Sequence, residues 1–412
     1  MHTLRNSFTL LAALGGVASA NGFFINEHDA KVTGRAGAVT ATDADPSAIV
    51  FNPGGIAIGG EGTHISIGGA LIVAKGTYTD TMNNSTDTDS GPAVVPQLFV
   101  THKLNDMVAI GVGFHLPFGL ALSWPDDSPQ ADVSTDSALR TYYITPAVGV
   151  DLKKQVPGLS AGAGIDLVPA TVELKQKLFF GDPSAGGAEG QATLGGQAFG
   201  VGGRVGVMYH PPTVPQLKTG IMYRTAVHLN FSGSGDFDMA DPYREQLPPD
   251  GDISTTLHLP MAIAGGVAYS VMPQLEIEAD AVWQDWSTFK TIDITLPDGT
   301  HQVAPQDYSD TVTVRVGAEY ALPEQHAAVR AGYIYDPTPI PSTTISARLP
   351  DANRNDITVG GSYSFGNYDL SLGLLAVLPS KKTASDKLYE PIYKGEYEVS
   401  AFVASLGLIG KL

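Results

Sequence analysis

The sequence of 412 residues contains no cysteine, so disulfides and thiolate metal sites are excluded. Basic residues are scarce: 24 Lys and Arg stand against 42 Asp and Glu, which gives a net charge of -18. Phosphate binding needs a basic patch, and this excess of acid therefore argues against nucleic acid as a partner. After residue 20 the sequence also has no apolar run near the roughly 18 residues that a membrane-crossing helix requires.

Sequence patterns of catalysis are also missing. The chain has no Gly-x-Ser-x-Gly, no His-Glu-x-x-His and no phosphate-binding Gly-x-x-x-x-Gly-Lys motif. Its 10 histidines are scattered, without the i, i+4 pairs or cysteine partners typical of a zinc site. We therefore expect a protein that is not an enzyme, with no catalytic residues, no metal site and no cofactor.

Residues 1–20, MHTLRNSFTLLAALGGVASA, have a short basic start, an apolar run and a small-residue end at Ala18-Ser19-Ala20. This order is typical of a secretory signal peptide. An N-terminal membrane helix is the alternative, but the apolar run is too short to cross a bilayer of about 30 Å. We expect an exported chain that begins at Asn21.

Most of the chain after residue 62 alternates between apolar and polar residues, the pattern of a β-strand with two different faces. In TVTVRVGAEY the apolar face holds Val312, Val314 and Val316, and Arg315 lies on the other face. The segment KTGIMYRTAVHLNF is read the same way, with one apolar face interrupted only by Thr225. That expected face consists of Ile221, Tyr223, Val227, Leu229 and Phe231.

The lengths of these runs and of their connections distinguish a membrane barrel from a soluble β-sandwich. The runs extend over roughly 10 to 20 residues, whereas soluble strands average about five or six. Short connections such as HKLND alternate with long, acidic ones such as SGSGDFDMADPYREQLPPDGD. Short turns at one end and long loops at the other are typical of outer-membrane barrels, with apolar side chains facing lipid and polar ones facing the lumen. Because lipid offers no hydrogen-bond partners, the sheet must close on itself.

The sequence therefore predicts an all-β fold: a transmembrane antiparallel β-barrel over residues 63–412, with about 14 strands. The expected strands begin near His64, Ala93, Met107, Leu139, Leu159, Thr193, Leu217, Ile253, Leu275, Tyr308, Ala327, Asp356, Asp369 and Glu396. A barrel of this size leaves an open lumen, since about eight strands already suffice for side chains to fill the interior.

Residues 21–62 do not alternate, and they contain a reversal at Asn52, Pro53 and Gly54. Pro53 cannot donate to a strand ladder, and the glycine permits a sharp turn against a wall. We expect this segment to be an N-terminal hatch that plugs the lumen. A soluble periplasmic extension is the alternative.

These segments resemble the FadL family of outer-membrane transporters for long-chain fatty acids, with its TodX-like relatives that pass aromatic hydrocarbons. The resemblance extends over nearly all of the expected mature chain. The motifs that carry it are GFFINE, GRAGAVTATDADPSAIVFNPGGIA, LPFGL, WQDWSTF and RAGYIYDPTPIPSTTISARLPDANR. The sequence departs from the family at Gly54, where alanine is usual, and at Leu412, where many barrels end in an aromatic residue.

The resemblance implies where a solute would bind on its way in. Capture would fall to the third and fourth outer loops, which here contain Phe179, Phe180 and Phe237, although packing between loops would explain these side chains equally well. The inner pocket would involve Phe23 and Asn52, which match the family motif.

The arginines Arg204, Arg224 and Arg315 lie on expected inward faces and are candidate partners for a carboxylate. The alternative is a structural network with the lumen acids Asp166, Glu276, Glu278, Asp280 and Glu319. The family's fatty-acid carriers place a basic residue on strand five, where this sequence has Thr171.

For the exit, Pro117 interrupts strand three, AIGVGFHLPFGL, in which Gly113 also lies, and the family releases its substrate sideways at a kink in this strand. A proline at a strand end without functional meaning is the alternative.

We therefore expect passive transport of hydrophobic small molecules, most of all long-chain fatty acids, across the bacterial outer membrane by a monomer that contacts lipid and lipopolysaccharide. Uptake of aromatic hydrocarbons is one alternative, and a non-transporting barrel that acts as adhesin or scaffold is another. A lipase-type enzyme is disfavoured by the missing nucleophile motifs.

Overall fold

The computed structural model describes residues 22–181, 187–385 and 393–412, so the expected signal peptide lies outside the described residues. In this part of the chain the strands form one antiparallel barrel of 14 spans, closed by the pairing of the first strand with the last, His64 opposite Lys411. The prediction of a barrel with about 14 strands is confirmed. Among the described helices, none is long and apolar enough to cross a membrane.

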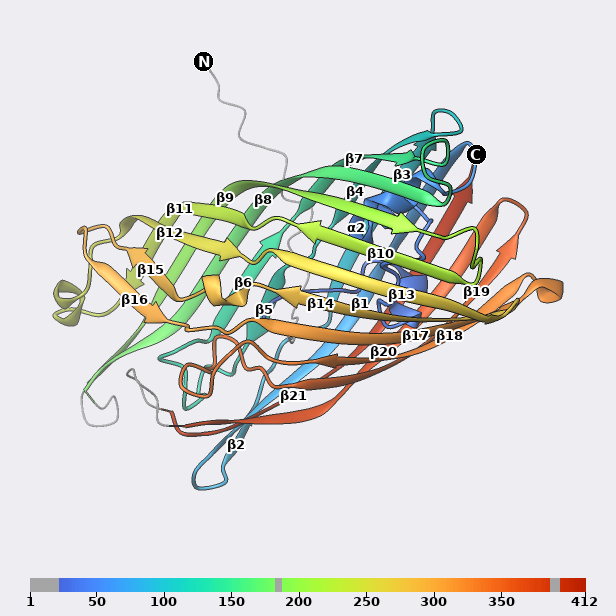
Figure 1. The fold of residues 1–412 in the computed structure, drawn as a ribbon. Coiled ribbons are helices and arrows are strands. Elements are labelled where there is room, and N and C mark those ends of the chain that lie inside the picture. The colour runs from blue at the N-terminus through green and yellow to red at the C-terminus, as the bar shows by residue number, and fades with distance from the viewer. Residues whose placement is uncertain (1–21, 182–186, 386–392) are drawn as a thin grey trace, which may run out of the picture.

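Eight of the described spans are continuous strands (Figure 1). They are β1 (Thr63–Asp80), β3 (Ala93–Lys103), β8 (Leu159–Phe180), β9 (Ala188–Tyr209), β18 (Ala327–Asp336), β19 (Arg354–Phe365), β20 (Tyr368–Ala384) and β21 (Gly395–Lys411). A short additional strand, β2 (Ser85–Asp87), pairs with the end of β1.

The other six spans are each built from two strands with a break between them. The pairs are β4 (Val108–His115) and β5 (Gly119–Ser123), β6 (Asp136–Thr141) and β7 (Tyr143–Asp151), β10 (Leu217–Arg224) and β11 (Val227–Asp238), β12 (Gly251–Leu259) and β13 (Ala262–Met272), β14 (Leu275–Gln284) and β15 (Thr291–Thr295), and β16 (His301–Pro305) and β17 (Thr311–Leu322). The expected strand starts lie within a few residues of these bounds, except that the span expected near Tyr308 already begins at His301.

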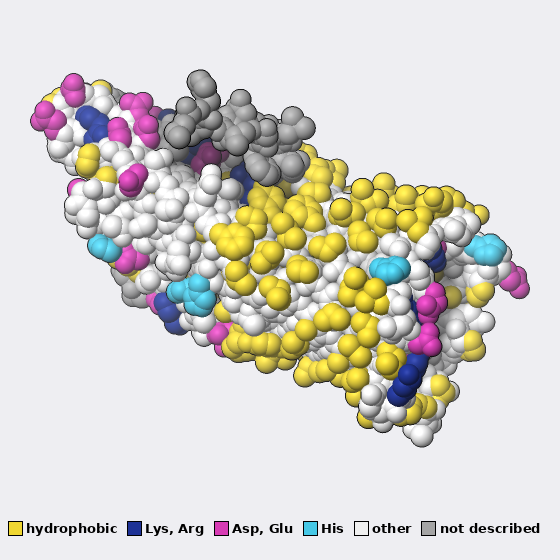
Figure 2. All heavy atoms as spheres, turned by 90° about the horizontal axis from the view of Figure 1, so that it is seen from above, with side chains coloured by type: hydrophobic (Ala, Val, Ile, Leu, Met, Phe, Trp, Pro, Cys, Tyr) yellow, Lys and Arg dark blue, Asp and Glu magenta, His cyan; other side chains and the backbone are white. Residues whose placement is uncertain are grey.

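Alternation places apolar side chains on the outside of the wall. Val312, Val314 and Val316 are exposed, whereas Arg315 between them is buried in the lumen. Figure 2 shows hydrophobic side chains in a broad band around the wall, with charged side chains gathered beyond the band. The band is the surface that the expected lipid contact requires.

One predicted face is wrong. Ile221 and Tyr223 of β10 face outward, but Val227, Leu229 and Phe231 of β11 are buried inside the barrel. The span is broken at Thr225 and Ala226, where the register against β9 shifts by one residue, from Arg224 opposite Arg204 to Ser232 opposite Gln197. A shift of one residue moves every following side chain to the other face of a sheet.

Residues 22–62 lie inside the ring of strands, in the half that carries the short turns (Figure 1). They form three short helices: α1 (Ala30–Gly34), α2 (Ala48–Phe51) and the 3-10 helix η1 (Pro53–Ala57). Further 3-10 turns lie in the connections, at η3 (Tyr243–Gln246), η4 (Trp286–Thr288) and η5 (Pro323–Gln325). We call residues 22–62 the hatch segment from here on.

Local capping explains two of the hatch helices. Asp29 Oδ1 accepts hydrogen bonds from the backbone N–H groups of Lys31 (2.7 Å) and Val32 (3.4 Å) at the start of α1. Asn52 Oδ1 accepts from the N–H of Gly54 at 3.1 Å, and Pro53 occupies the first turn of η1, where its missing N–H costs nothing.

The hatch segment approaches the wall at glycines. A Cβ atom on Gly162 of β8 would lie 2.2 Å from the carbonyl oxygen of Pro53, and one on Gly206 of β9 would lie 2.1 Å from Oδ1 of Asn52. Only glycine permits such an approach of two backbones. The wall glycines therefore fix where η1 is seated.

Candidate functional site

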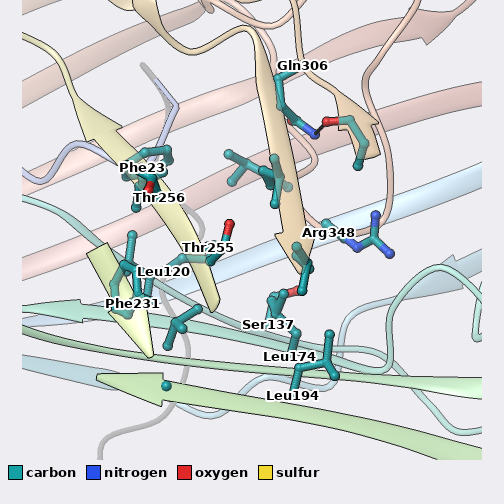
Figure 3. Close-up of a pocket in the computed structure, with 18 of the residues that line it drawn as sticks. Phe23, Leu120, Ser137, Leu174, Leu194, Phe231, Thr255, Thr256, Gln306 and Arg348 are labelled. Atoms are coloured by element: carbon teal, nitrogen blue, oxygen red, sulfur yellow. Dashed lines mark hydrogen bonds between the residues drawn. The ribbon is translucent and has the colours of Figure 1, made fainter. Parts of the chain in front are cut away.

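An apolar cavity of about 150 Å³ lies between the hatch segment and the outer loops (Figure 3). Its walls come from strands on several sides of the barrel and from the connection between β18 and β19. The apolar side chains that line it include Phe23, Leu120, Leu139, Val172, Leu174, Leu194, Phe231, Phe289, Ile292, Tyr308, Ile340 and Leu349. Burial of apolar surface contributes about 25 cal/mol for each Å², so such a cavity favours a hydrophobic solute.

Phe23 forms the inner end of this cavity. Its ring meets Trp286 edge to face, with the ring centroids 5.0 Å apart, and Phe289 in the same way at 5.8 Å. Sequence reasoning selected Phe23 but not its partners, although Trp286 and Phe289 both belong to the WQDWSTF motif. That motif was the available signal for the aromatic part of the cavity.

Two contacts hold Phe23 in place through the backbone. The N–H of Gly119 donates to the carbonyl of Phe23 at 2.9 Å, and the N–H of Ile25 donates to the carbonyl of Pro117 at 2.8 Å. Phe24 and Phe118 form an isolated antiparallel bridge. The start of the hatch segment is therefore paired, like a short strand, with the third span at its break.

Asp351 also binds this start of the hatch segment. Its Oδ2 accepts from the N–H of Gly22 at 3.3 Å and from the hydroxyl of Thr338 at 2.6 Å. Burial raises the pKa of Asp351 to about 7. A carboxyl group in the connection between β18 and β19 thus positions the residue that precedes Phe23.

The wall is incompletely paired beside Pro117. The ladder between β3 and β4 ends at Leu98 opposite Phe114, and no pairing of β5 with β3 occurs in the described part of the chain. A small cavity of about 50 Å³ lies in this break, lined by Val95, Pro96, Leu116, Phe118, Ala121, Leu139 and Tyr142 among others. Gly113 lies within the paired part, where a Cβ would meet Phe99 and Ile49 rather than the break.

Arg204 is bound inside a structural network. Its Nη2 lies 2.9 Å from Oδ1 of Asp166, and its Nη1 donates to the carbonyl of Val50 in the hatch segment at 2.9 Å. The side chain is almost fully buried and lines none of the cavities described here. Arg204 therefore belongs to a structural network with a lumen acid, which was the alternative to a carboxylate-binding role.

Arg224 has a different environment. Its guanidinium carbon lies 4.9 Å from the centre of the Phe118 ring and 5.1 Å from that of Phe24. Nε and Nη2 of Arg224 have no hydrogen-bond partner among the described residues, and no described acid forms an ion pair with it. These two atoms form one side of the guanidinium fork, the geometry that binds a carboxylate with two hydrogen bonds.

Arg315 and Asn52 contact the hatch segment. Arg315 Nη1 lies 3.4 Å from the carbonyl of Gly37. Asn52 Nδ2 donates to the carbonyls of Thr40 (2.8 Å) and of Val207 in β9 (3.1 Å). The amide of Asn52 is thus occupied in joining two turns of the hatch segment to the wall.

The acids of β14 bind the hatch segment rather than the three predicted arginines. Asp280 Oδ2 accepts from the N–H groups of Val39 and Thr40, both at 3.0 Å. Arg35 Nη2 donates to Glu276 at 3.0 Å and to Glu278 at 3.2 Å. Backbone donors and Arg35 of the hatch segment thus bind this acidic row, and Lys218 of β10 lies 2.7 Å from Glu276 as a second cation.

The predicted capture residues lie at the outer ends of strands rather than in the loops themselves, because the strands extend further than expected: Phe179 and Phe180 end β8, and Phe237 belongs to β11. Phe237 is buried and lines a second cavity of about 290 Å³, together with Leu247 of the loop that follows β11. The ring of Phe180 packs against Tyr243 of that loop at 5.5 Å, whereas Phe179 is exposed. Within the described residues no cluster of three or more His, Asp and Glu side chains could hold a metal ion.

Comparison with known proteins supports the same architecture. The model of the outer membrane protein transport protein family (OMPP1/FadL/TodX) matches residues 11–408. The chain is 26% identical over 418 residues to the 47 kDa outer membrane protein of Pasteurella multocida, covering 92% of each chain. It is 24% identical over 404 residues to the long-chain fatty acid transport protein of Escherichia coli strain K12, covering 88% of each.

Two solved structures share the fold. A Pseudomonas aeruginosa FadL homologue superposes with a TM-score of 0.82 at 19% identity, covering 95% of this chain and 99% of that chain. The Pseudomonas putida toluene transporter TodX superposes with a TM-score of 0.74 at 19% identity, covering 96% and 99%. At these identities the likeness concerns the fold alone, and it extends over nearly the whole barrel.

Proposed function

The chain belongs to the outer membrane protein transport family of OMPP1, FadL and TodX proteins, and from this we propose that it carries long-chain fatty acids passively across the outer membrane. The observation that supports this most directly is the apolar cavity between the outer loops and the hatch segment. A water-filled pore would not help an apolar solute, which needs a sequence of apolar surfaces instead.

The route we propose starts at the outer loops. Phe237 and Leu247 line the second cavity, which shares Leu174 and Leu194 with the apolar cavity below it. A solute captured there passes into the apolar cavity without crossing water. Exposed Phe179 is the first contact on this route, and Phe180 supports the same loop surface.

At the inner end of the route, Leu120 and Leu139 line both the apolar cavity and the small cavity in the break, and Phe23 lines the apolar cavity. Arg224 lies just behind, with two donors that no described residue uses. We assign to Arg224 the contact with a carboxylate that has reached the hatch segment. Arg204, Arg315 and Asn52 act indirectly, because they hold the hatch segment in the position that closes the lumen.

The exit we propose is lateral, through the break between β3 and β5. The lining of the break is mostly apolar, and Ile25 at the start of the hatch segment contributes to it. Movement of residues 22–25 would connect the apolar cavity to the hydrocarbon of the membrane. The remainder of the hatch segment would stay seated, so that the lumen remains closed to ions.

A second candidate solute is an aromatic hydrocarbon, because Phe23, Phe289 and Tyr308 offer the cavity several aromatic rings. Uptake measurements test the proposal against this alternative and against a scaffold role. Cells that lack their own hydrophobic-solute channels are supplied with this protein and with dilute labelled fatty acid or toluene. Fatty acid uptake is the expected result, and uptake of neither solute would leave the scaffold or adhesin role.

A further inference from the structure

Three cavities meet at two polar residues, Arg348 in the connection between β18 and β19 and Gln302 in β16. Arg348 lines the apolar cavity, the second cavity below Phe237 and Leu247, and a third, more polar cavity of about 150 Å³. In Figure 3 it lies at the end of the apolar cavity opposite Phe23, and its guanidinium points away from Phe23. Arg348 thus borders the passage between the second cavity and the apolar cavity.

The position of Arg348 is fixed by its neighbours. Trp124 Nε1 donates to the carbonyl of Ala347 at 2.8 Å, and Ser346 and Leu349 form an isolated bridge across the turn. Arg348 Nη2 donates to Oε1 of Gln176 on β8 at 2.9 Å. The guanidinium is thus held at the junction rather than free to follow solvent.

The charge of Arg348 is not neutralised by a neighbour. Among the described residues no carboxylate lies within ion-pair distance of it, and it is the only lysine or arginine that lines the apolar cavity. Asp132 acts on it from further away, and its Oδ1 accepts from the hydroxyl of Tyr393 instead. Burial lowers the pKa of Arg348, but a guanidinium in a protein stays charged.

The cation of the second cavity differs in this respect. Lys175 lines that cavity too, but its Nζ is 2.9 Å from a carboxylate oxygen of Glu173. Of the lysines and arginines that line these three cavities in the described part of the chain, Arg348 is therefore the one without a paired carboxylate. Arg348 is half-buried, so its unpaired charge keeps part of its contact with water and is favourably placed to bind a negative charge that a ligand supplies.

We propose that Arg348 receives the carboxylate head group of a single-chain amphiphile and thereby selects such anions over uncharged hydrocarbons; this rests on the proposed function. The head group stays at the junction of the three cavities, where the polar third cavity hydrates it. The alkyl chain extends into the apolar cavity toward Phe23 and Phe289. A neutral hydrocarbon gains nothing from Arg348 and must displace the water around it.

The test compares tetradecanoate with tetradecan-1-ol, which share one alkyl chain and differ in the charge of the head group. Uptake is measured against concentration in cells whose own channels are deleted, for the unmodified protein and for Arg348→Gln, Arg348→Lys and Lys177→Gln. Lys177 is a matched control, because it is a cation of the same outer half that lines none of the three cavities. Heat-dependent gel mobility verifies that each barrel folds.

For Arg348→Gln the half-saturating tetradecanoate concentration should rise about tenfold, because the variant loses one charge-assisted contact with the carboxylate. Its tetradecanol uptake should change less than about twofold. Arg348→Lys should restore part of the loss, and Lys177→Gln should behave as the unmodified protein. Equal effects on acid and alcohol, or no effect on either, would overturn the assignment of Arg348. Absence of uptake of both compounds by the unmodified protein would instead refute the proposed function.

Discussion

The N–H of Ile25 and the carbonyl oxygen of Pro117 are joined by a hydrogen bond of 2.8 Å. The third span is thus completed at its break by the hatch segment from inside, and not by β3 from the side. Backbone groups that face a bilayer without a partner are costly, and this pairing removes part of that cost. If the start of the hatch segment moves away, the third span therefore loses this hydrogen bond.

The first prediction concerns the break itself. Ala121 lines the small cavity there and Ala121→Phe should fill it, so fatty acid uptake should fall severalfold while the barrel still folds. Ala279→Phe, on the exposed face of β14, is the matched control and should leave uptake unchanged. Uptake is measured beside heat-dependent gel mobility. Normal uptake by a folded Ala121→Phe protein would favour a straight path through the lumen.

A second prediction concerns the hatch segment. Deletion of residues 21–60 should leave a folded barrel, because the 14 spans pair with one another in a closed ring. The deletion should open the lumen to ions, which planar-bilayer conductance detects. Equal conductance of the deleted and intact proteins would show that the hatch segment does not close the lumen.

A substitution at Gly206 tests the closure of the lumen without deletion of the hatch segment. A side chain there would collide with Asn52, since even a Cβ lies 2.1 Å from Oδ1. Gly206→Val should therefore displace η1 and raise ion conductance without unfolding the wall. Gly265→Val is the control, because no atom lies within 4 Å of a Cβ at that position. The idea fails if both variants conduct alike.

His28 predicts a response to acid. Burial lowers the pKa of His28 to about 3, and the charges of Arg204 and Arg224 act in the same direction. A released His28 has its ordinary pKa of 6.5, so between pH 6.5 and 3 the open hatch binds a proton that the seated hatch does not. The contribution of His28 to seating is therefore fully present above pH 6.5 and is lost as the pH falls.

At pH 5 this difference lowers the free energy of opening by up to about 2 kcal/mol. The ratio of conductance at pH 5 to conductance at pH 7 should be larger for the unmodified protein than for His28→Phe. His115 packs edge to face against His28 at 5.3 Å and remains in the variant, so the difference isolates His28. An identical pH response of both proteins would contradict the assignment.

The wall could be predicted from sequence wherever alternation is uninterrupted. The outward position of Val312, Val314 and Val316 could be predicted from their spacing alone, because the side chains on the lipid-facing side of the wall are apolar throughout. Val227 and Leu229 could not be placed, since the register shift at Thr225 and Ala226 depends on pairing with β9 and leaves no local signal. The prediction was wrong there for that reason.

The candidate site was less accessible to sequence reasoning. Phe23 was found through a motif. Arg348 also lies within a quoted motif, RAGYIYDPTPIPSTTISARLPDANR, but nothing in that motif distinguishes it until the β18–β19 connection folds over the barrel. Arg204 and Arg224 are alike in sequence, both inward-facing on strands. Their difference depends on whether an acid such as Asp166 lies within reach, and this is a property of the closed ring.

The break beside Pro117 has one more consequence. The wall around it exposes Val94, Leu98, Val112 and Ile144 and thus belongs to the apolar band, whereas the outer face of β11 is polar. A solute leaving there would dissolve in oil and not in water. Its flux would then follow its oil–water partition coefficient, and the membrane itself would act as the sink that makes net movement inward possible without an energy supply.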